Sequence, residues 1–150
     1  MHDRYDRERS DLAAVLRWAA RQDLQEAAGN HCSLSVSDNG DKFLINPDGR
    51  YFSTLKGSEL ILVDLNDQTG TDQANISAWL LHGQILQKVE NAKCVLHLHP
   101  KYVTVLATLV DSTIYPIDQV SMRFYERVAF DSEFSGMIVD QTEADRLCDK

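Results

Sequence analysis

Residues 82–107 read "HGQILQKVENAKCVLHLHPKYVTVLA", and the rest of the chain is interpreted outward from this stretch. The apolar run over 93–99 predicts a strand that ends in two histidines, His97 and His99. Pro100 follows at once and fits the first turn of a helix over 101–110. The residues before the strand complete a helix that we predict over 76–89, from its apolar residues at helical spacing. A helix, a strand and a helix in this order indicate an α/β domain.

His97 and His99 allow two interpretations. In a strand, residues two apart point to the same face, so both rings project together and one Zn²⁺ could take a nitrogen from each. The alternative is a pair of surface or hydrogen-bonded histidines on a half-buried strand, whose other face, Leu96 and Leu98, packs into the core. The pair alone does not decide between them, because a catalytic zinc normally has three protein ligands.

Three other residues bear on this question. His31 follows the turn in "GNHCS" and could approach the same cleft as the pair. His82 lies on the predicted helix over 76–89, where we expect a packed or hydrogen-bonded side chain. Cys94 begins the histidine strand and is expected to be a small buried hydrophobic residue.

The remaining elements follow from hydrophobic periodicity and turn residues. An amphipathic helix is predicted over 8–27, with Ser10 or Asp11 as its cap and Gly29 as its end. The turn "DNGD" at 38–41 predicts a hairpin. Further strands are predicted at 32–37, 42–46, 60–65 and, shorter, around 114–117, 127–130 and 137–139. A last helix is predicted from Thr142, its expected cap, to the end of the chain.

Composition excludes several classes of function. The formal net charge is −8 and the 15 lysines and arginines are scattered, whereas nucleic acids and anionic membranes require a basic patch. The start of the chain is polar and no apolar run is long enough to span a membrane. Cysteines number three, an odd count, and none has CxxC spacing. We therefore expect a cytoplasmic protein with free thiols that binds neither nucleic acid nor membrane.

Three stretches resemble the class II aldolase/adducin family. They are the turn and strand of "AAGNHCSLSV" at 27–36, the turn and strand of "FLINPDGRYFSTLKGSELILVDL" at 43–65, and the opening stretch at 82–107. Several motifs in this order are far more specific than two histidines. The resemblance implies one three-layer α/β/α domain over residues 1–150 with a central, mostly antiparallel sheet. Because the chain ends inside a predicted helix, we expect this domain to be incomplete at its C-terminal end.

The resemblance also implies a metal. Catalytic members of the family bind a divalent ion, usually Zn²⁺, through three histidines, and two of these correspond to His97 and His99. The third belongs to a later "Asn-His-Gly" segment that this sequence does not contain. Catalytic members are tetramers with sites between subunits, so the resemblance implies a homo-oligomer that takes a small-molecule substrate.

Members that act on sugar phosphates bind the anion with a Gly-Asn turn, a Pro-Ser-Gly turn and a Ser-Ser pair before the second helix, and this chain matches them in part. Asp48 and Ile76 stand where serine is preferred, and a carboxylate at position 48 repels a phosphate. Turn chemistry alone also explains the glycines and the asparagine. The resemblance assigns the substrate-binding candidates to Gly29, Asn30, Gly49 and Ser77.

Ala78 is the largest departure from the family. Its aldolases carry an acid/base glutamate at this position, and an alanine cannot move a proton. The pattern "DQVSMRFYERVAF" at 118–130 fits a branch that lacks this glutamate, and Asp118, Tyr125 and Glu126 are substitutes by position only. One expected function is a metal-dependent lyase or epimerase that polarises a hydroxy-carbonyl compound and stabilises an enediolate. The other is a non-catalytic adducin-like domain for assembly or partner binding. The retained histidine pair favours metal binding.

Overall fold

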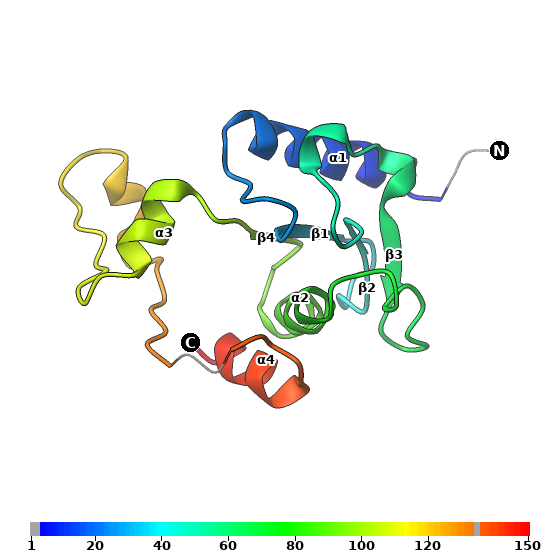
Figure 1. Ribbon diagram of the computed structural model, residues 1–150. Coiled ribbons are helices and arrows are strands. Elements are labelled where there is room, and N and C mark those ends of the chain that lie inside the picture. The colour runs from blue at the N-terminus through cyan, green and yellow to red at the C-terminus, as the bar shows by residue number, and fades with distance from the viewer. Residues whose placement is uncertain (1–3, 134–135) are drawn as a thin grey trace.

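The computed structural model describes residues 4–133 and 136–150 and has three layers (Figure 1). The middle layer is a sheet in the order β3-β2-β1-β4, in which every neighbouring pair is antiparallel. Helix α1 covers one face, and α2 covers the other with α4 packed on it. This confirms the predicted α/β/α architecture. The strands are β1 (His31–Ser35), β2 (Lys42–Ile45), β3 (Ile61–Asp64) and β4 (Cys94–His97), and the helices are α1 (Asp6–Arg21), α2 (Ile76–Lys88) and α4 (Gln141–Cys148).

Helix α1 begins two residues earlier and ends six residues earlier than the sequence predicted. Ser10 and Asp11 lie inside the helix and do not cap it; the Ser10 hydroxyl donates to the Asp6 carbonyl at 2.8 Å. The helix ends because Asp23 adopts a left-handed conformation, with φ 58°. The Leu24 amide then donates back to the carbonyl of Ala19 at 3.0 Å, which is the pattern of a Schellman motif. Gly29 lies beyond this end.

Strand alternation builds a hydrophobic cluster on each face of the sheet. In β2, Leu44 faces α1, whereas Phe43 and Ile45 face α2, because successive side chains point to opposite faces. Each of these three side chains is fully buried. The cluster under α1 also contains Phe52 from the 3₁₀ turn η1 (Phe52–Thr54) and Leu60, which follows the 3₁₀ turn η2 (Gly57–Glu59).

The edge strand β4 departs from expectation on one face. Its register with β1 pairs His31 with His97 and Cys32 with Leu96. Cys94 is exposed and Leu96 is 47% exposed, so the predicted burial of both is wrong. The reason is position: β4 is outermost in the sheet, and α1 packs on β1 and β2. Leu98 is partly buried against the α1 cluster, as predicted.

The segment from α3 (Lys101–Ala107) to residue 130, here called the arm, stands apart from the three layers (Figure 1). Helix α3 ends three residues earlier than predicted, and the arm's other regular element is the 3₁₀ turn η3 (Ser121–Phe124). The strands predicted around 114–117, 127–130 and 137–139 do not form in the described residues. Apolar residues with strand propensity become a strand only where another strand pairs with them, and the sheet ends at β4.

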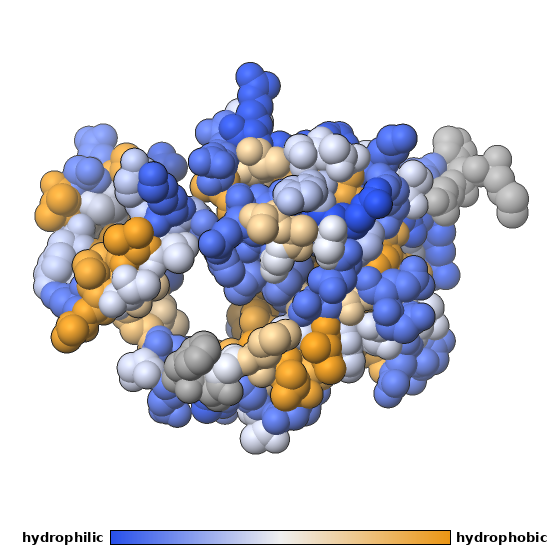
Figure 2. Space-filling view, in the orientation of Figure 1, coloured by the Kyte–Doolittle hydropathy of each residue, from blue (hydrophilic) through white to orange (hydrophobic). Residues whose placement is uncertain are grey.

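Apolar side chains of the arm are largely exposed, and Figure 2 shows them gathered on this lobe. They include Val103, Leu109, Ile117 and Phe124. Just past the arm, the chain returns to the body through an ion-pair cluster. Arg146 of α4 donates to both carboxylate oxygens of Asp131, at 2.9 and 2.8 Å.

Gly40, in the turn between β1 and β2, gives a test of this packing. Its φ is 74°, and an added Cβ would lie 2.1 Å from the carbonyl oxygen of Leu86 in α2. Gly49 has a similar φ of 67° but open space around it. We expect Gly49→Ala to lower the free energy of unfolding by about 1–2 kcal/mol, the cost of the left-handed conformation. Gly40→Ala should cost a further ~1–3 kcal/mol, because the turn must move away from α2. Urea denaturation measures both, and equal losses would contradict the close approach.

Candidate metal and substrate site

The two histidines of the pair converge. His97 is the last residue of β4 and His99 lies just beyond the strand, yet their Nε2 atoms are 2.9 Å apart. Two Zn–N bonds of about 2.0–2.1 Å at a tetrahedral angle would place the nitrogens about 3.3 Å apart. The two atoms that would bind a metal therefore already point to a common position.

A carboxylate lies behind His99. The Nδ1 atom of His99 is 2.7 Å from Oε2 of Glu26, in the loop between α1 and β1. Two hydrogen bonds hold this loop in place. The Glu26 amide donates to Oδ1 of the buried Asn30 at 2.6 Å, and the Asn46 side chain donates to the Asn30 carbonyl. The Asn30 Nδ2 atom is buried and has no hydrogen-bond partner among the described residues.

A second chain of polar side chains lies behind His97. The ring of His31 stacks on that of His97 at 4.4 Å between centroids, 13° from parallel. His31 Nδ1 is 2.9 Å from His82 Nε2, and His82 Nδ1 is 2.7 Å from the Ser33 hydroxyl. His31 thus approaches the pair and His82 is fully buried and hydrogen-bonded, as predicted.

Burial decides the charge of these inner histidines. It lowers the pKa of His31 to about 3, with smaller contributions from His97 and His99. It also lowers the pKa of His82 well below 6.5, and that of His97 in the same direction. The rings are therefore neutral at physiological pH, the form in which imidazole nitrogens bind metals.

A pocket of about 380 Å³ opens beside these histidines. Of the sequence candidates, Gly29, Ser77 and His97 line it, together with His31 and the backbone segment 136–138. Asn30 is buried next to Gly29. Gly49 lies in an exposed turn and does not line the pocket. The chain thus brings three of its six candidate site residues to one cavity.

The pocket lining contains no lysine or arginine among the described residues. Two groups at the start of α2 are already engaged. The Ser77 hydroxyl donates to the carbonyl of Ile138 at 2.7 Å, and Asn75 Nδ2 donates to the carboxylate of Asp48 at 3.3 Å. Ala78 is fully buried in the cluster under α2.

The acid/base substitutes considered from sequence lie elsewhere. Asp118, Tyr125 and Glu126 are on the arm, and none of them lines the pocket. Asp118 instead accepts hydrogen bonds from the backbone of η3. His31, in contrast, can transfer a proton and lines the pocket beside His97.

Within residues 4–133 and 136–150, no group of three or more histidine, cysteine or acidic side chains is arranged to hold a metal ion. The imidazole nitrogens of His97 and His99 are of the type that binds divalent metals, and they lie close together. They supply only two protein ligands among the described residues. Among these same residues, no helix is both long and apolar enough to cross a membrane.

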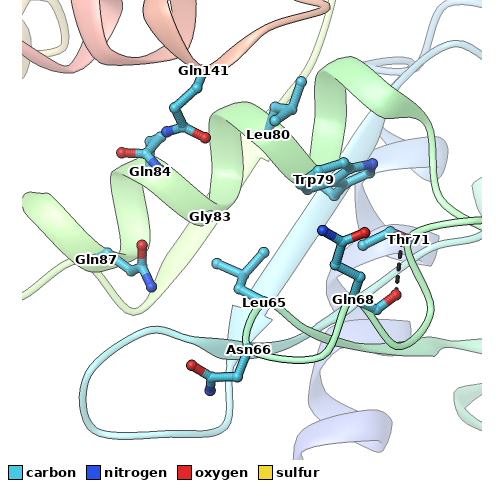
Figure 3. Close-up of a pocket in the computed structure, with 10 residues that line it drawn as sticks. All are labelled: Leu65, Asn66, Gln68, Thr71, Trp79, Leu80, Gly83, Gln84, Gln87 and Gln141. Carbon is cyan, nitrogen blue, oxygen red and sulfur yellow. Dashed lines mark hydrogen bonds between the residues drawn. The ribbon is translucent and has the colours of Figure 1, made fainter.

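A second pocket, of about 340 Å³, lies between α2, α4 and the turn after β3 (Figure 3). Its wall is rich in amides, with Gln84 and Gln141 facing each other and Gln68 beside the Trp79 ring. None of its lining residues titrates near neutral pH, so these residues offer no acid or base.

The sequence and the fold of this chain are similar to those of known proteins. The domain described as class II aldolase and adducin N-terminal matches residues 10–146. The chain belongs to this family. It is 29% identical to an aldolase II superfamily protein from Pseudomonas syringae, with a TM-score of 0.79 over 93% of this chain and 56% of that one.

The curated relatives include both an enzyme and an adducin. Decarboxylase NovR of Streptomyces niveus is 25% identical over 90% of this chain and 51% of its own length. Alpha-adducin of Rattus norvegicus is 28% identical over 90% of this chain and 19% of its own length. The chain spans about half the length of the bacterial relatives, so family membership does not by itself give an activity.

Sequence reasoning did not find Glu26, or the link from Ser33 through His82 to His31. The alternation of side chains along β1 predicts only that His31 and Ser33 share a face of the strand. Recognising the rest required the position of α2 over that face, which periodicity does not supply.

The lowered pKa of His82 predicts acid sensitivity of the metal-free protein. In the unfolded chain His82 takes up a proton as pH falls through 6.5, whereas the folded protein resists this. The contribution is constant above pH 6.5 and is lost below it, by up to about 1.4 kcal/mol per pH unit. Urea denaturation at pH 7.5 and 5.0 should show a smaller difference for His82→Gln than for the wild type. The same difference in both proteins would contradict this assignment.

Proposed function

We propose that this chain forms part of a metal-dependent lyase of the aldolase type, acting on a small hydroxy-carbonyl compound. The observation that carries this proposal is the convergence of the Nε2 atoms of His97 and His99 beside a pocket. Family membership supports it, as does the likeness to an aldolase II superfamily protein. The activity is proposed for a whole protein whose third metal ligand comes from outside these residues.

His97 and His99 would hold the divalent ion, for which Zn²⁺ is the first choice. When bound, it would supply Lewis-acid polarisation of a substrate oxygen. The pocket beside the pair orients the substrate against it, with Gly29 and Ser77 in the wall and His31 next to the metal ligand His97.

His31 is the group we propose for proton transfer, in place of the glutamate that Ala78 replaces. Its Nδ1 is bonded to His82, and the described residues give its Nε2 no partner. If His82 donates to Ser33, His31 donates to His82 and its Nε2 carries a lone pair that can accept a proton. With the two hydrogen bonds reversed, Nε2 carries a proton to donate. His31 can therefore act as a base in the first arrangement and as an acid in the second. A proton taken up at Nε2 makes the chain cationic, which burial opposes, so His31 returns that proton to the substrate within the reaction.

We further propose that the substrate carries no phosphate. The carboxylate of Asp48 already lies against Asn75, the cap of α2, where the helix dipole would favour an anion. The Ser77 hydroxyl is engaged by Ile138, and the lining offers no cation among the described residues. A free hydroxyl of the substrate remains compatible with this wall.

Metal uptake tests the proposal directly. Equilibrium dialysis of the whole protein, which supplies the third ligand, against Zn²⁺ should give about one ion per chain. The double variant His97→Ala, His99→Ala should lose this uptake. Lys93→Ala changes the residue just before β4 and is the control; this variant should retain zinc uptake. Wild-type protein that takes up no zinc above the double variant would refute the metal site.

Catalysis is tested by retro-aldol cleavage of small sugar acids and sugar phosphates by zinc-loaded protein. The expected result is cleavage of unphosphorylated compounds, reduced about 10²–10⁴-fold in His31→Phe, the usual contribution of a general acid or base. The phenyl ring keeps the stack on His97, so zinc uptake should be unchanged. A preference for phosphorylated compounds would contradict the assignment of Asp48.

The exposed arm favours a second candidate function, an adducin-like domain used for assembly. Its apolar side chains leave a groove of about 690 Å³ between α3 and residues 128–133. Exposed apolar side chains that are grouped on one part of the surface are typical of protein–protein contacts. A homo-oligomer, proposed from the family resemblance, would use this surface.

Sedimentation velocity tests the second candidate. Self-association of the wild type that is lost in Leu109→Asp would support it, because the charge falls on the exposed arm. Asp111→Ala changes a neighbouring exposed residue without adding charge to the groove and is the control. A monomeric wild type at high micromolar concentration would contradict assembly through the arm.

A further inference from the structure

We propose that Glu26 is a positioning residue of the metal site, which fixes the tautomers of both histidines and presents His99 as a ready-made ligand. This inference rests on the proposed metal-dependent function. It assigns a role to a loop residue far from the pair in sequence, whose carboxylate reaches His99 Nδ1 at 2.7 Å.

The direction of the hydrogen bonds follows from the carboxylate. An ionised carboxylate accepts and cannot donate, so His99 Nδ1 must carry a proton and donate it to Glu26. In its neutral form His99 has one N–H, so its Nε2 then carries a lone pair. The 2.9 Å contact between the Nε2 atoms still needs a proton, and His97 Nε2 must provide it. One carboxylate thereby orders the protons of two rings.

This order makes the two ligands unequal. His99 already presents the lone pair that a metal needs. His97 must move its proton from Nε2 to Nδ1 before it can bind, remaining neutral as it does so. The described residues give His97 Nδ1 no hydrogen-bond partner, so the move breaks no contact at that nitrogen, and the proton leaves the position that the metal takes.

Glu26 is held for this task although its side chain is largely exposed. Its backbone amide is fixed by Asn30, which is itself buried and tied to Asn46. A histidine ligand whose other nitrogen donates to a carboxylate is a better donor to the metal, and loss of such a partner typically weakens metal binding about 10–100-fold. Asn30 thus supports the site through the loop that carries Glu26.

The experiment is a Zn²⁺ titration of the metal-free whole protein at pH 8, followed by competition with a zinc indicator. Glu26→Ala should weaken the dissociation constant about 10–100-fold. Glu26→Gln should weaken it less, because an amide oxygen can still accept from His99 Nδ1. Glu90→Ala removes the same charge from the turn before β4 and should bind zinc like the wild type.

Nitrogen-15 NMR of the histidine rings gives an independent readout. Without metal, His99 should be protonated at Nδ1 and His97 at Nε2; with zinc, both should be protonated at Nδ1. In Glu26→Ala the metal-free preference of His99 should be lost.

Two results would overturn the inference while leaving the metal site intact. They are zinc affinity of Glu26→Ala within twofold of the wild type, or an equal loss in Glu90→Ala. A wild-type chain that binds no zinc would instead overturn the proposed function together with this role of Glu26.

Discussion

The antiparallel pairing of β1 with β4 is the constraint on which the candidate site depends. Its register sets His31 opposite His97 and leaves both on the face that α2 covers. A slip of one residue would turn His97 toward α1 and separate it from the pocket, because strand side chains alternate with period two. The stacking of the two rings, the contact with His82 and the position of the pocket all follow from this register.

Around this pairing, the site is assembled from segments that are distant in sequence. β1 and α2 provide the Ser33, His82 and His31 chain on one side of His97, and the loop before β1 provides Glu26 on the other side of His99. The Glu26 carboxylate therefore fixes the proton positions at one end of the cluster, whereas the Ser33 hydroxyl at the other end can donate or accept. Such ordering is what a metal site needs before the metal arrives, because ligands held in place lose less freedom on binding.

Sequence patterns predicted the body of the fold well and the arm poorly. α2, β2 and β3 lie within a residue or two of the predicted ranges, because local periodicity and turn residues specify them. The strands predicted after residue 110 failed because pairing is not local: a strand requires a neighbour that periodicity cannot identify. Cys94 and Leu96 were misjudged for a similar reason, since burial at an edge depends on how far α1 extends. The convergence of His97 and His99 was predictable from their spacing, whereas Glu26 was not.

The pocket wall formed by residues 136–138 has a consequence for biosynthesis. The sheet and the two helices that cover it are complete once residue 97 has left the ribosome. The pocket waits for roughly 40 further residues, which at 5–20 residues per second means several seconds of translation. During that interval the pocket beside the histidines lacks this part of its wall, and the exposed arm emerges next. The order of synthesis thus puts the two sides of the pocket in place several seconds apart.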